Sequence, residues 1–425
     1  MQINADFILY EHLRPYMATM RGVHSLFLVT VFFSALFAGC LETFSQNQEP
    51  EIKSIKLTPS SNIKAGDSVT FSANVQDPDG DTLTYTWDFD DSDGNSEMQA
   101  SGESVEWTFG KEGSYVVTLR VEDSQYSVTE TKTVNVLDAE AVQPSADAGS
   151  LLPSQDCDGE DTPSGTHYLV YICDMDLEEG GNNNDVDPKA SVTLDGSDSS
   201  HPASADGHYI NSWKWDLNIY VDSDEDGIAD NDVDEEGETY QWTDRSPGKW
   251  KIQLTVTDDQ GMIDTDQIWV YINYVGVWSE FIVDGNNSAD QSNNPEIEFT
   301  YPSIFDAPAR NKPSRVEYYL VYEQIDSEGN WLPGVPDDQK RNRLDLWIYN
   351  STDDHVSNTS ERIDETRTGG DCNEDEDYCL LLQLGSYQID PKQNAVNEIW
   401  TVKIKNEKAH EASIKEFRIE LTYKM

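Results

Sequence analysis

The sequence predicts an all-β fold of tandem β-sandwiches followed by a third β-sandwich at the C-terminus. Short segments of alternating apolar and polar residues recur along the chain, with turn-forming residues between them. One strand–turn–strand pattern occurs twice, first around residues 85–89 and again around residues 213–217. Patterns typical of amphipathic helices are almost absent after the N-terminal segment.

Residues 1–40 have the features of an export signal. Arg21 precedes an apolar run, residues 26–37, and small residues then lead to Cys40. The run is shorter than the roughly 20 residues that span a bilayer, which is typical of a signal peptide. Its end resembles a lipoprotein signal, and this resemblance implies cleavage before Cys40 and a lipid on that cysteine. An ordinary signal peptide or a short membrane anchor remains the alternative. The polar residues 41–53 are expected to form a tether.

The charge of the chain excludes some partners. It has 81 acidic and 28 basic residues, a formal net charge of −53. This charge repels phosphate backbones and anionic lipid headgroups, so we expect no nucleic-acid partner and no membrane contact except through the lipid. Hydrophobic residues make up 37% and aromatic residues 10%, which favours a folded chain with a hydrated acidic surface over disorder.

Residues 54–137 are expected to form the first sandwich. Alternating segments predict its strands, near residues 68–75, 83–89, 105–109, 115–121 and 128–136. The module resembles the PKD family, immunoglobulin-like β-sandwiches of cell-surface and secreted proteins, through four segments: 66–71, 77–80, 85–89 and 113–115. The resemblance gives Trp87 a place in the core and Asp88 a place in a turn. An acidic turn, residues 90–94, replaces the G-D-G that usually follows in the family.

A second PKD-like module is expected at residues 144–275. Residues 144–149 look like the start of such a module, but an acidic segment at about 150–189 then interrupts it. A second insertion follows Trp215, Asp216 and Leu217, the counterpart of the first module's Trp-Asp pair.

Residues 277–425 are not a third copy. Six segments predict strands, near residues 296–301, 316–322, 344–349, 380–384, 399–404 and 414–421. Two of them, 344–350 and 400–406, are similar to strands of jelly-roll domains of the pre-peptidase C-terminal type. This resemblance implies a jelly-roll-like sandwich.

The remaining four cysteines form two local pairs. Cys157 and Cys173 lie in the second module, and Cys372 and Cys379 lie in the third. An exported chain meets oxidising conditions, so we expect two short-range disulfides. A four-thiolate zinc site is disfavoured, because the pairs lie in different domains and neither has C-x2-C spacing.

The strongest chemical motif is an acidic loop in the second insertion. Carboxylates at alternate positions before a glycine can turn several oxygens onto one point, and calcium requires six to eight such ligands. The loop resembles EF-hand loops and thrombospondin type 3 repeats. The expected ligands are Asp222, Asp224, Asp226, the carbonyl of Ile228, and Asp230. Val233 occupies the position of the EF-hand glutamate, so Asp232, Asp234 or Glu235 must complete the shell. A hydrated acidic loop without an ion remains the alternative.

Catalytic motifs are missing from the sequence. It has no G-x-S-x-G, no H-E-x-x-H, no P-loop and no G-x-G-x-x-G. Three sequons predict possible glycosylation, at Asn286, Asn350 and Asn358. Five tryptophans are candidates for stacking on sugar rings or for core positions: Trp242, Trp250, Trp269, Trp278 and Trp331.

These observations predict a non-catalytic, lipid-anchored cell-surface scaffold or adhesion protein. Calcium would stabilise its PKD-like modules, which would present the C-terminal sandwich to a surface polymer, glycan or protein ligand. Two alternatives remain. One is a carbohydrate-binding surface protein with residues 277–425 as the binding module, and the other is an accessory subunit of a secreted hydrolase.

Overall fold

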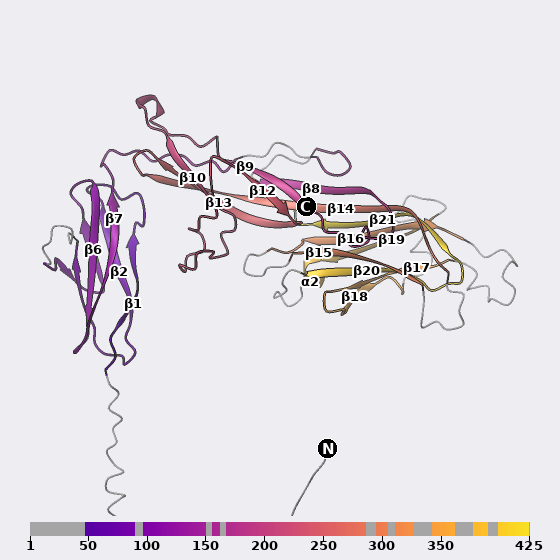
Figure 1. Cartoon of the computed structure of the whole chain (residues 1–425), viewed down its shortest axis with the longest axis horizontal. Coiled ribbons are helices and arrows are strands. Elements are labelled where there is room, and N and C mark those ends of the chain that lie inside the picture. The colour runs from indigo at the N-terminus through magenta and orange to yellow at the C-terminus, as the bar shows by residue number, and fades with distance from the viewer. Residues whose placement is uncertain are drawn as a thin grey trace, which may run out of the picture. The chain divides into compact units, whose positions relative to one another are not determined.

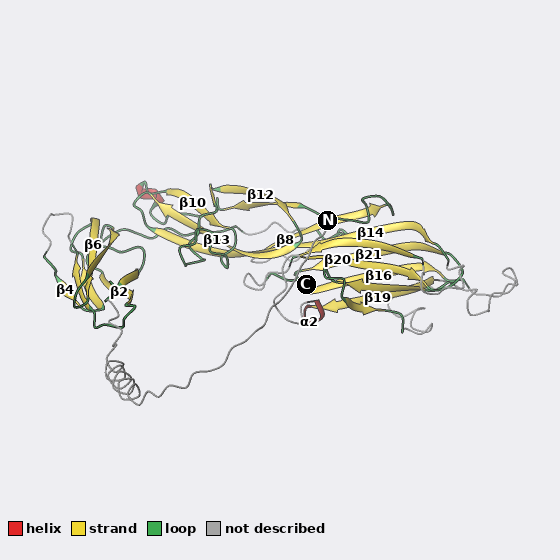
Figure 2. Cartoon of the chain, turned by 60° about the horizontal axis from the view of Figure 1, so that its bottom comes forward, coloured by secondary structure: helices red, strands yellow, loops and turns green. Residues whose placement is uncertain are grey.

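The computed structural model describes residues 47–89, 97–149, 155–161, 167–285, 295–304, 311–325, 342–361, 377–389 and 398–424. Almost all of its regular structure is β, arranged in several sheets, so the predicted fold class is confirmed (Figure 2). Within these residues no helix has the length and apolar character needed to cross a membrane. The predicted signal segment, with Cys40, lies outside them.

The chain forms two compact units. Among the described residues, the first contains 47–58, Thr70–Trp107 and Tyr115–Val134, and the second contains the rest.

The first sandwich contains strands β1 to β7 in two sheets. One sheet has the order β1 (Glu51–Thr58), β2 (Ser68–Gln76), β5 (Ser104–Thr108), and the other has the order β4 (Ala100–Ser101), β3 (Thr84–Asp88), β6 (Gly113–Glu122), β7 (Ser127–Val136). Trp87 is fully buried between them and contacts Phe71, with ring centroids 5.9 Å apart. The structure thus confirms the predicted core position of Trp87.

The second sandwich repeats this arrangement. Strands β9 (Ala190–Asp195) and β12 (Thr239–Arg245) form one layer, and the other has the order β11 (Glu235–Glu236), β10 (Ile210–Asp216), β13 (Gly248–Asp258), β14 (Ile263–Val283). A 3-10 turn, Ser204–Asp206, lies between β9 and β10. Inward-facing apolar side chains such as Trp215, Leu254 and Val270 are completely buried in its core.

The two Trp-Asp pairs occupy equivalent places. The indole nitrogen of Trp87 donates to the carbonyl of Gly102 at 2.9 Å, and that of Trp215 donates to the carbonyl of Gly237 at 2.9 Å. Both glycines have φ of +132°, which favours glycine at each. The sequence repeat is therefore also a structural repeat at the two Trp-Asp pairs, and the acidic turn at residues 90–94 lies outside the described residues.

The described residues of the C-terminal sandwich form eight strands. They are the second half of β14, then β15 (Glu296–Ser303), β16 (Arg315–Glu323), β17 (Leu344–Tyr349), β18 (His355–Asn358), β19 (Asp377–Gly385), β20 (Glu398–Asn406) and β21 (Ala412–Thr422), with one helical turn, α2 (Ser386–Ile389). The sheets have the orders β14-β21-β16-β19 and β15-β20-β17-β18. Numbered along the domain, these orders are 1-8-3-6 and 2-7-4-5, which is jelly-roll topology.

The second and third sandwiches share strand β14, a feature that sequence reasoning did not anticipate. Residues 263–272 of this strand pair with β13, and residues 274–283 pair with β21 (Figure 1). Strand β8 (His167–Leu177) pairs in parallel with β14 from Trp269 to Trp278. The expected division between residues 275 and 277 therefore falls inside a continuous strand, and β8 spans the junction.

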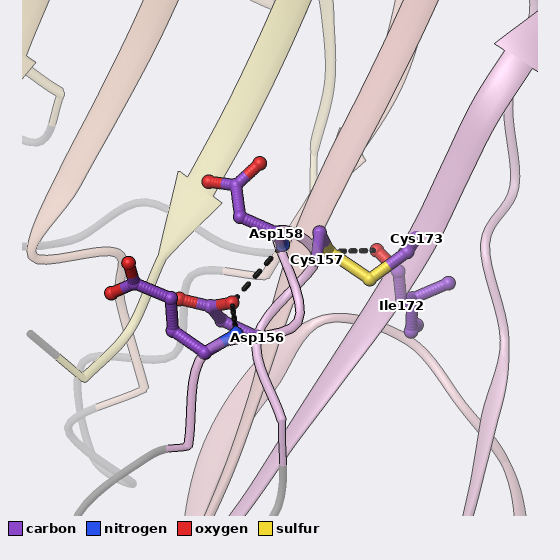
Figure 3. Close-up of a disulfide and its surroundings, with 6 residues drawn as sticks. Asp156, Cys157, Asp158, Ile172 and Cys173 are labelled. Atoms are coloured by element: carbon purple, nitrogen blue, oxygen red, sulfur yellow. Dashed lines mark hydrogen bonds between the residues drawn. A yellow bond between two sulfur atoms is a disulfide. The ribbon is translucent and has the colours of Figure 1, made fainter.

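The acidic segment at residues 150–189 is not a plain insertion, because it supplies β8. The disulfide Cys157–Cys173 joins the preceding segment to this strand, which confirms the predicted pairing (Figure 3). The Cys157 sulfur lies 4.0 Å from the carbonyl oxygen of Ile172. Cys379 is also disulfide-bonded, and Cys372, its predicted partner, lies outside the described residues.

Candidate metal centre

The acidic loop connects β10 to β11 and lies on the outward face of the second sandwich. Its first residues, which follow β10, still run alongside β13. There the Ile219 amide donates to the carbonyl of Lys251 at 3.1 Å. Further along, the side chain of Gln253 donates to the carbonyl of Asp230 at 2.8 Å, and Gln267 donates to Gln253 at 2.7 Å. The loop is thus supported by outward-facing residues of two strands.

Three of the predicted ligands come together in this loop. One carboxylate oxygen from each of Asp222, Asp224 and Asp232 lies within 4.8 Å of the other two. Gly227 has φ of +90°, and its amide donates to Asp222 at 2.8 Å. The turn at Gly227 therefore brings the carboxylates of Asp222 and Asp224 close to that of Asp232, which follows later in the same loop.

Two aspartates of this loop region are buried, and each leaves one carboxylate oxygen without a hydrogen-bond partner. Asp232 is only 4% exposed, and its Oδ1 has no hydrogen-bond partner, whereas its Oδ2 accepts from the Ser223 amide. Asp216, at the base of the loop, is 2% exposed and leaves Oδ2 without a partner. An isolated buried carboxylate is costly unless a cation compensates it.

The pKa values of three carboxyl groups in this region are shifted by burial, neighbouring charges and hydrogen bonds. Burial raises the pKa of Asp216 to about 7, against the hydrogen bond from the Asn218 amide, and the charges of Asp234, Asp232 and Asp230 raise it further. For Asp224, the hydrogen bond from the Asp226 amide lowers the pKa. Desolvation and the charges of Asp226, Asp232 and Asp222 outweigh that bond, and the pKa is raised. The hydrogen bond from the Ser223 amide lowers the pKa of Asp232, which keeps it ionised.

Two of the other expected ligands, Asp226 and Asp234, accept hydrogen bonds from within the loop. Asp226 accepts hydrogen bonds from the Ile228 amide at 2.8 Å and from Asn231 at 3.0 Å. Asp234 accepts from the Leu217 amide at 2.7 Å and from the Ser223 hydroxyl at 3.1 Å. These two carboxylates stabilise the loop backbone, and the carbonyl of Asp230 accepts from Gln253 as noted above.

The sequence interpretation missed Asp216. Its Trp-Asp context assigned it to a turn, and its Oδ1 does accept from the Asn218 amide at 2.8 Å. The available signal was the position itself, because this aspartate directly precedes a loop with six further aspartates.

The residues suit a hard divalent cation. Asp222, Asp224 and Asp232 each offer a carboxylate oxygen, and these oxygens lie within 4.8 Å of one another. Calcium prefers such all-oxygen sites and accepts irregular geometry, whereas zinc prefers nitrogen and sulfur ligands. No histidine or cysteine belongs to this cluster.

The other sequence-predicted residues lie elsewhere. Asn350 lies in the turn between β17 and β18, Asn358 is the last residue of β18, and Asn286 lies outside the described residues. Trp242 and Trp278 are buried core residues, and Trp250 packs against the core. Trp269 is half-buried on the outward face of β14, and Trp331 is outside the described residues.

Comparison with known proteins places one part of the chain. The model of the PKD domain family matches residues 47–137. The PKD1 domain of Vibrio anguillarum Epp is 30% identical, with 21% of this chain and 96% of that chain covered and a TM-score of 0.17. The PKD1 domain from the Vibrio cholerae metalloprotease PrtV is 27% identical, with 21% and 98% covered and a TM-score of 0.17. No curated protein matches the chain.

Proposed function

Residues 47–137 form a PKD domain, and from this premise we propose that the chain is a non-catalytic, lipid-anchored cell-surface scaffold stabilised by calcium. In this proposal the loop at residues 216–234 holds the ion, and the jelly roll is the module presented to a surface polymer, glycan or protein ligand. The observation that carries the proposal is the cluster of Asp222, Asp224 and Asp232 carboxylates, in which the buried Oδ1 of Asp232 has no hydrogen-bond partner.

In such a scaffold, bound calcium would stabilise the folded conformation of the acidic loop. Without a cation, the aspartates of the loop repel one another across a few ångströms, and the repulsion opposes folding of the loop onto β13. A bound ion would neutralise them and hold the loop against Gln253. Because β14 continues into the jelly roll, support of the second sandwich also supports the domain that is presented.

Export is supported by the sequence and the disulfide. The apolar run before Cys40 is typical of a signal peptide, and the Cys157–Cys173 disulfide fits an oxidising compartment.

The lipid on Cys40 remains the prediction of the lipoprotein resemblance. Cys40→Ser should move the protein from the membrane fraction to the soluble fraction, as seen by detergent partitioning. A variant that stays with the membrane would contradict the anchor.

Thermal melting tests the calcium site. At calcium concentrations about 100 times the Kd, binding stabilises the folded state by about 2.7 kcal/mol, which corresponds to a rise in Tm of several degrees over chelator. Asp232→Asn should abolish most of this rise. Glu225→Gln is the matched control, because it removes one charge from the same loop outside the cluster. An equal rise in both variants would contradict the site.

A further inference from the structure

An aromatic row lies on the outward face of the second sandwich, directly beside the acidic loop. Trp269 and Tyr271 are alternate residues of β14, with ring centroids 5.8 Å apart and ring planes 21° from parallel. Tyr220, from the loop, places its ring 6.5 Å from that of Trp269. All three side chains are half-buried, so each presents part of its ring to solvent.

Basic groups flank this row. Lys251 on β13 and His167 on β8 are the register partners of Trp269 on either side. The ammonium of Lys424 lies 5.7 Å from the centroid of the Tyr271 ring. Lys251 and Lys424 have no ion-pair partner anywhere in the described part of this chain, although acidic residues outnumber basic ones by 81 to 28.

The aromatic row and the two lysines without ion-pair partners indicate the chemistry of the ligand. A row of aromatic rings suits the flat apolar face of a sugar ring, and unpaired ammonium groups suit a carboxylate. Burial and the charge of Lys424 both lower the pKa of His167, so its imidazole is neutral at pH 7 and can hydrogen-bond a hydroxyl. A long phosphate polymer would meet the repulsion of the whole chain, whereas a short acidic sugar meets mainly the local lysines.

We propose that this face, formed by Trp269, Tyr271, Tyr220, Lys251, Lys424 and His167, binds a glycan that carries uronic-acid residues. The inference deepens the proposed scaffold function by naming a ligand class, and it depends on the calcium loop only for the placement of Tyr220. It locates binding on the second sandwich, whereas sequence reasoning had considered the C-terminal domain.

The jelly roll offers a matched comparison surface. Trp347 and Tyr349 are half-buried on the outward face of β17, and Lys405 lies 5.1 Å from the Trp347 ring. There, however, Lys403 and Lys405 both pair with Glu296 at 3.1 Å, so their charges are already compensated. This surface has aromatic rings with lysines over them, but it has no unpaired cation like Lys251.

Titration calorimetry on the full chain tests the proposal, with trigalacturonate and neutral galactotriose as ligands in saturating calcium. We expect trigalacturonate to bind and galactotriose to bind at least tenfold more weakly. Trp269→Ala and Lys251→Glu should each weaken trigalacturonate binding about tenfold or more, and Trp347→Ala should leave it unchanged. Thermal melting of each variant confirms that it is folded, and Trp269→Phe should restore part of the affinity.

Three results would overturn the proposal: no binding of trigalacturonate, equal binding of both sugars, or loss of binding in Trp347→Ala instead of Trp269→Ala. The calcium site is judged separately, by the calcium-dependent rise in Tm of Asp232→Asn. A chain that gains stability from calcium but fails to bind trigalacturonate would retain the scaffold proposal and lose this one.

Discussion

At the scale of single residues, the buried carboxyl group of Asp216 gives the loop a specific pH dependence. Asp216 is buried at its base with one unpartnered oxygen, and burial is the largest cause of its raised pKa. A group whose pKa is raised on folding binds more protons in the folded state than in the unfolded state. Its contribution therefore makes stability fall as pH rises from the unfolded pKa toward the folded pKa.

This reasoning predicts a specific pH dependence for Asp216. In chelator, stability should fall between pH 4 and about 7, and Asp216→Asn should remove up to about 4 kcal/mol of that fall. Saturating calcium should reduce the fall in the unmutated chain, because a cation favours the ionised form. Urea unfolding at several pH values measures it. An identical pH dependence in the variant would contradict the assigned role of Asp216.

Gly276 lies in the half of β14 that pairs with β21, shortly after the strand leaves β13 at Ile272. A Cβ atom at this position would lie 2.3 Å from the Tyr274 hydroxyl and 3.1 Å from the Trp278 ring, and both side chains are fully buried. The two core aromatics thus fill the space that any other residue would need.

Gly276→Ala should therefore lower the free energy of unfolding by about 1–3 kcal/mol, the usual cost of overpacking a core. Gly110→Ala is the control, because a Cβ there meets nothing within 4 Å. Denaturant unfolding measures both variants. Equal stabilities would show that Tyr274 and Trp278 relax without cost.

At the scale of elements, β8 is the strand that spans the junction between the second sandwich and the jelly roll. It pairs with β14 on both sides of Gly276, and Cys173 lies within it. The disulfide closes a segment with a sequence separation of 16 residues. For a loop of this size the expected stabilisation is about 3 kcal/mol.

Replacement of both Cys157 and Cys173 by serine should cost about that amount of stability. It should also reduce hydrogen-exchange protection along β8 more than along β20, which belongs to the opposite sheet of the jelly roll. Mass spectrometry of exchanged peptides measures both. Unchanged protection of β8 would mean that its pairing with β14 is sufficient without the disulfide.

Sequence reasoning recovered local elements better than their partners. Alternation identified the strands around Trp87 and Trp215, because a half-buried strand shows its two faces in its own residues. It could not show that β14 continues through Gly276, since strand length depends on pairing with β13 and β21, which lie far apart in the sequence. Asp174 and Asp176 made β8 resemble a hydrated loop.

The same division holds for the candidate site. The alternate aspartates and Gly227 predicted the turn, because its geometry is set by adjacent residues. Sequence spacing could not show that Asp232 is buried without a full set of partners, or that Asp216 lies beneath the loop. Those properties depend on how the loop packs on β13.

At the scale of the whole molecule, the proposed metal site and the jelly roll lie in the same compact unit. The second sandwich and the jelly roll belong to one compact unit and share β14. A ligand that binds only the folded state stabilises every segment that unfolds together with its site.

Calcium should therefore increase hydrogen-exchange protection in β16 and β21 of the jelly roll, as well as in β10 and β13 beside the loop. The slowest-exchanging amides of all four strands should gain a similar opening free energy. A gain confined to β10 and β13 would show that the two sandwiches unfold separately despite the shared strand.

Calorimetric titration of calcium into the chelator-stripped full chain tests the central claim most directly. A saturable calcium site at Asp222, Asp224 and Asp232 predicts a binding isotherm that Asp232→Asn abolishes and Glu225→Gln preserves. Isotherms that are the same in both variants would contradict a calcium site in this loop.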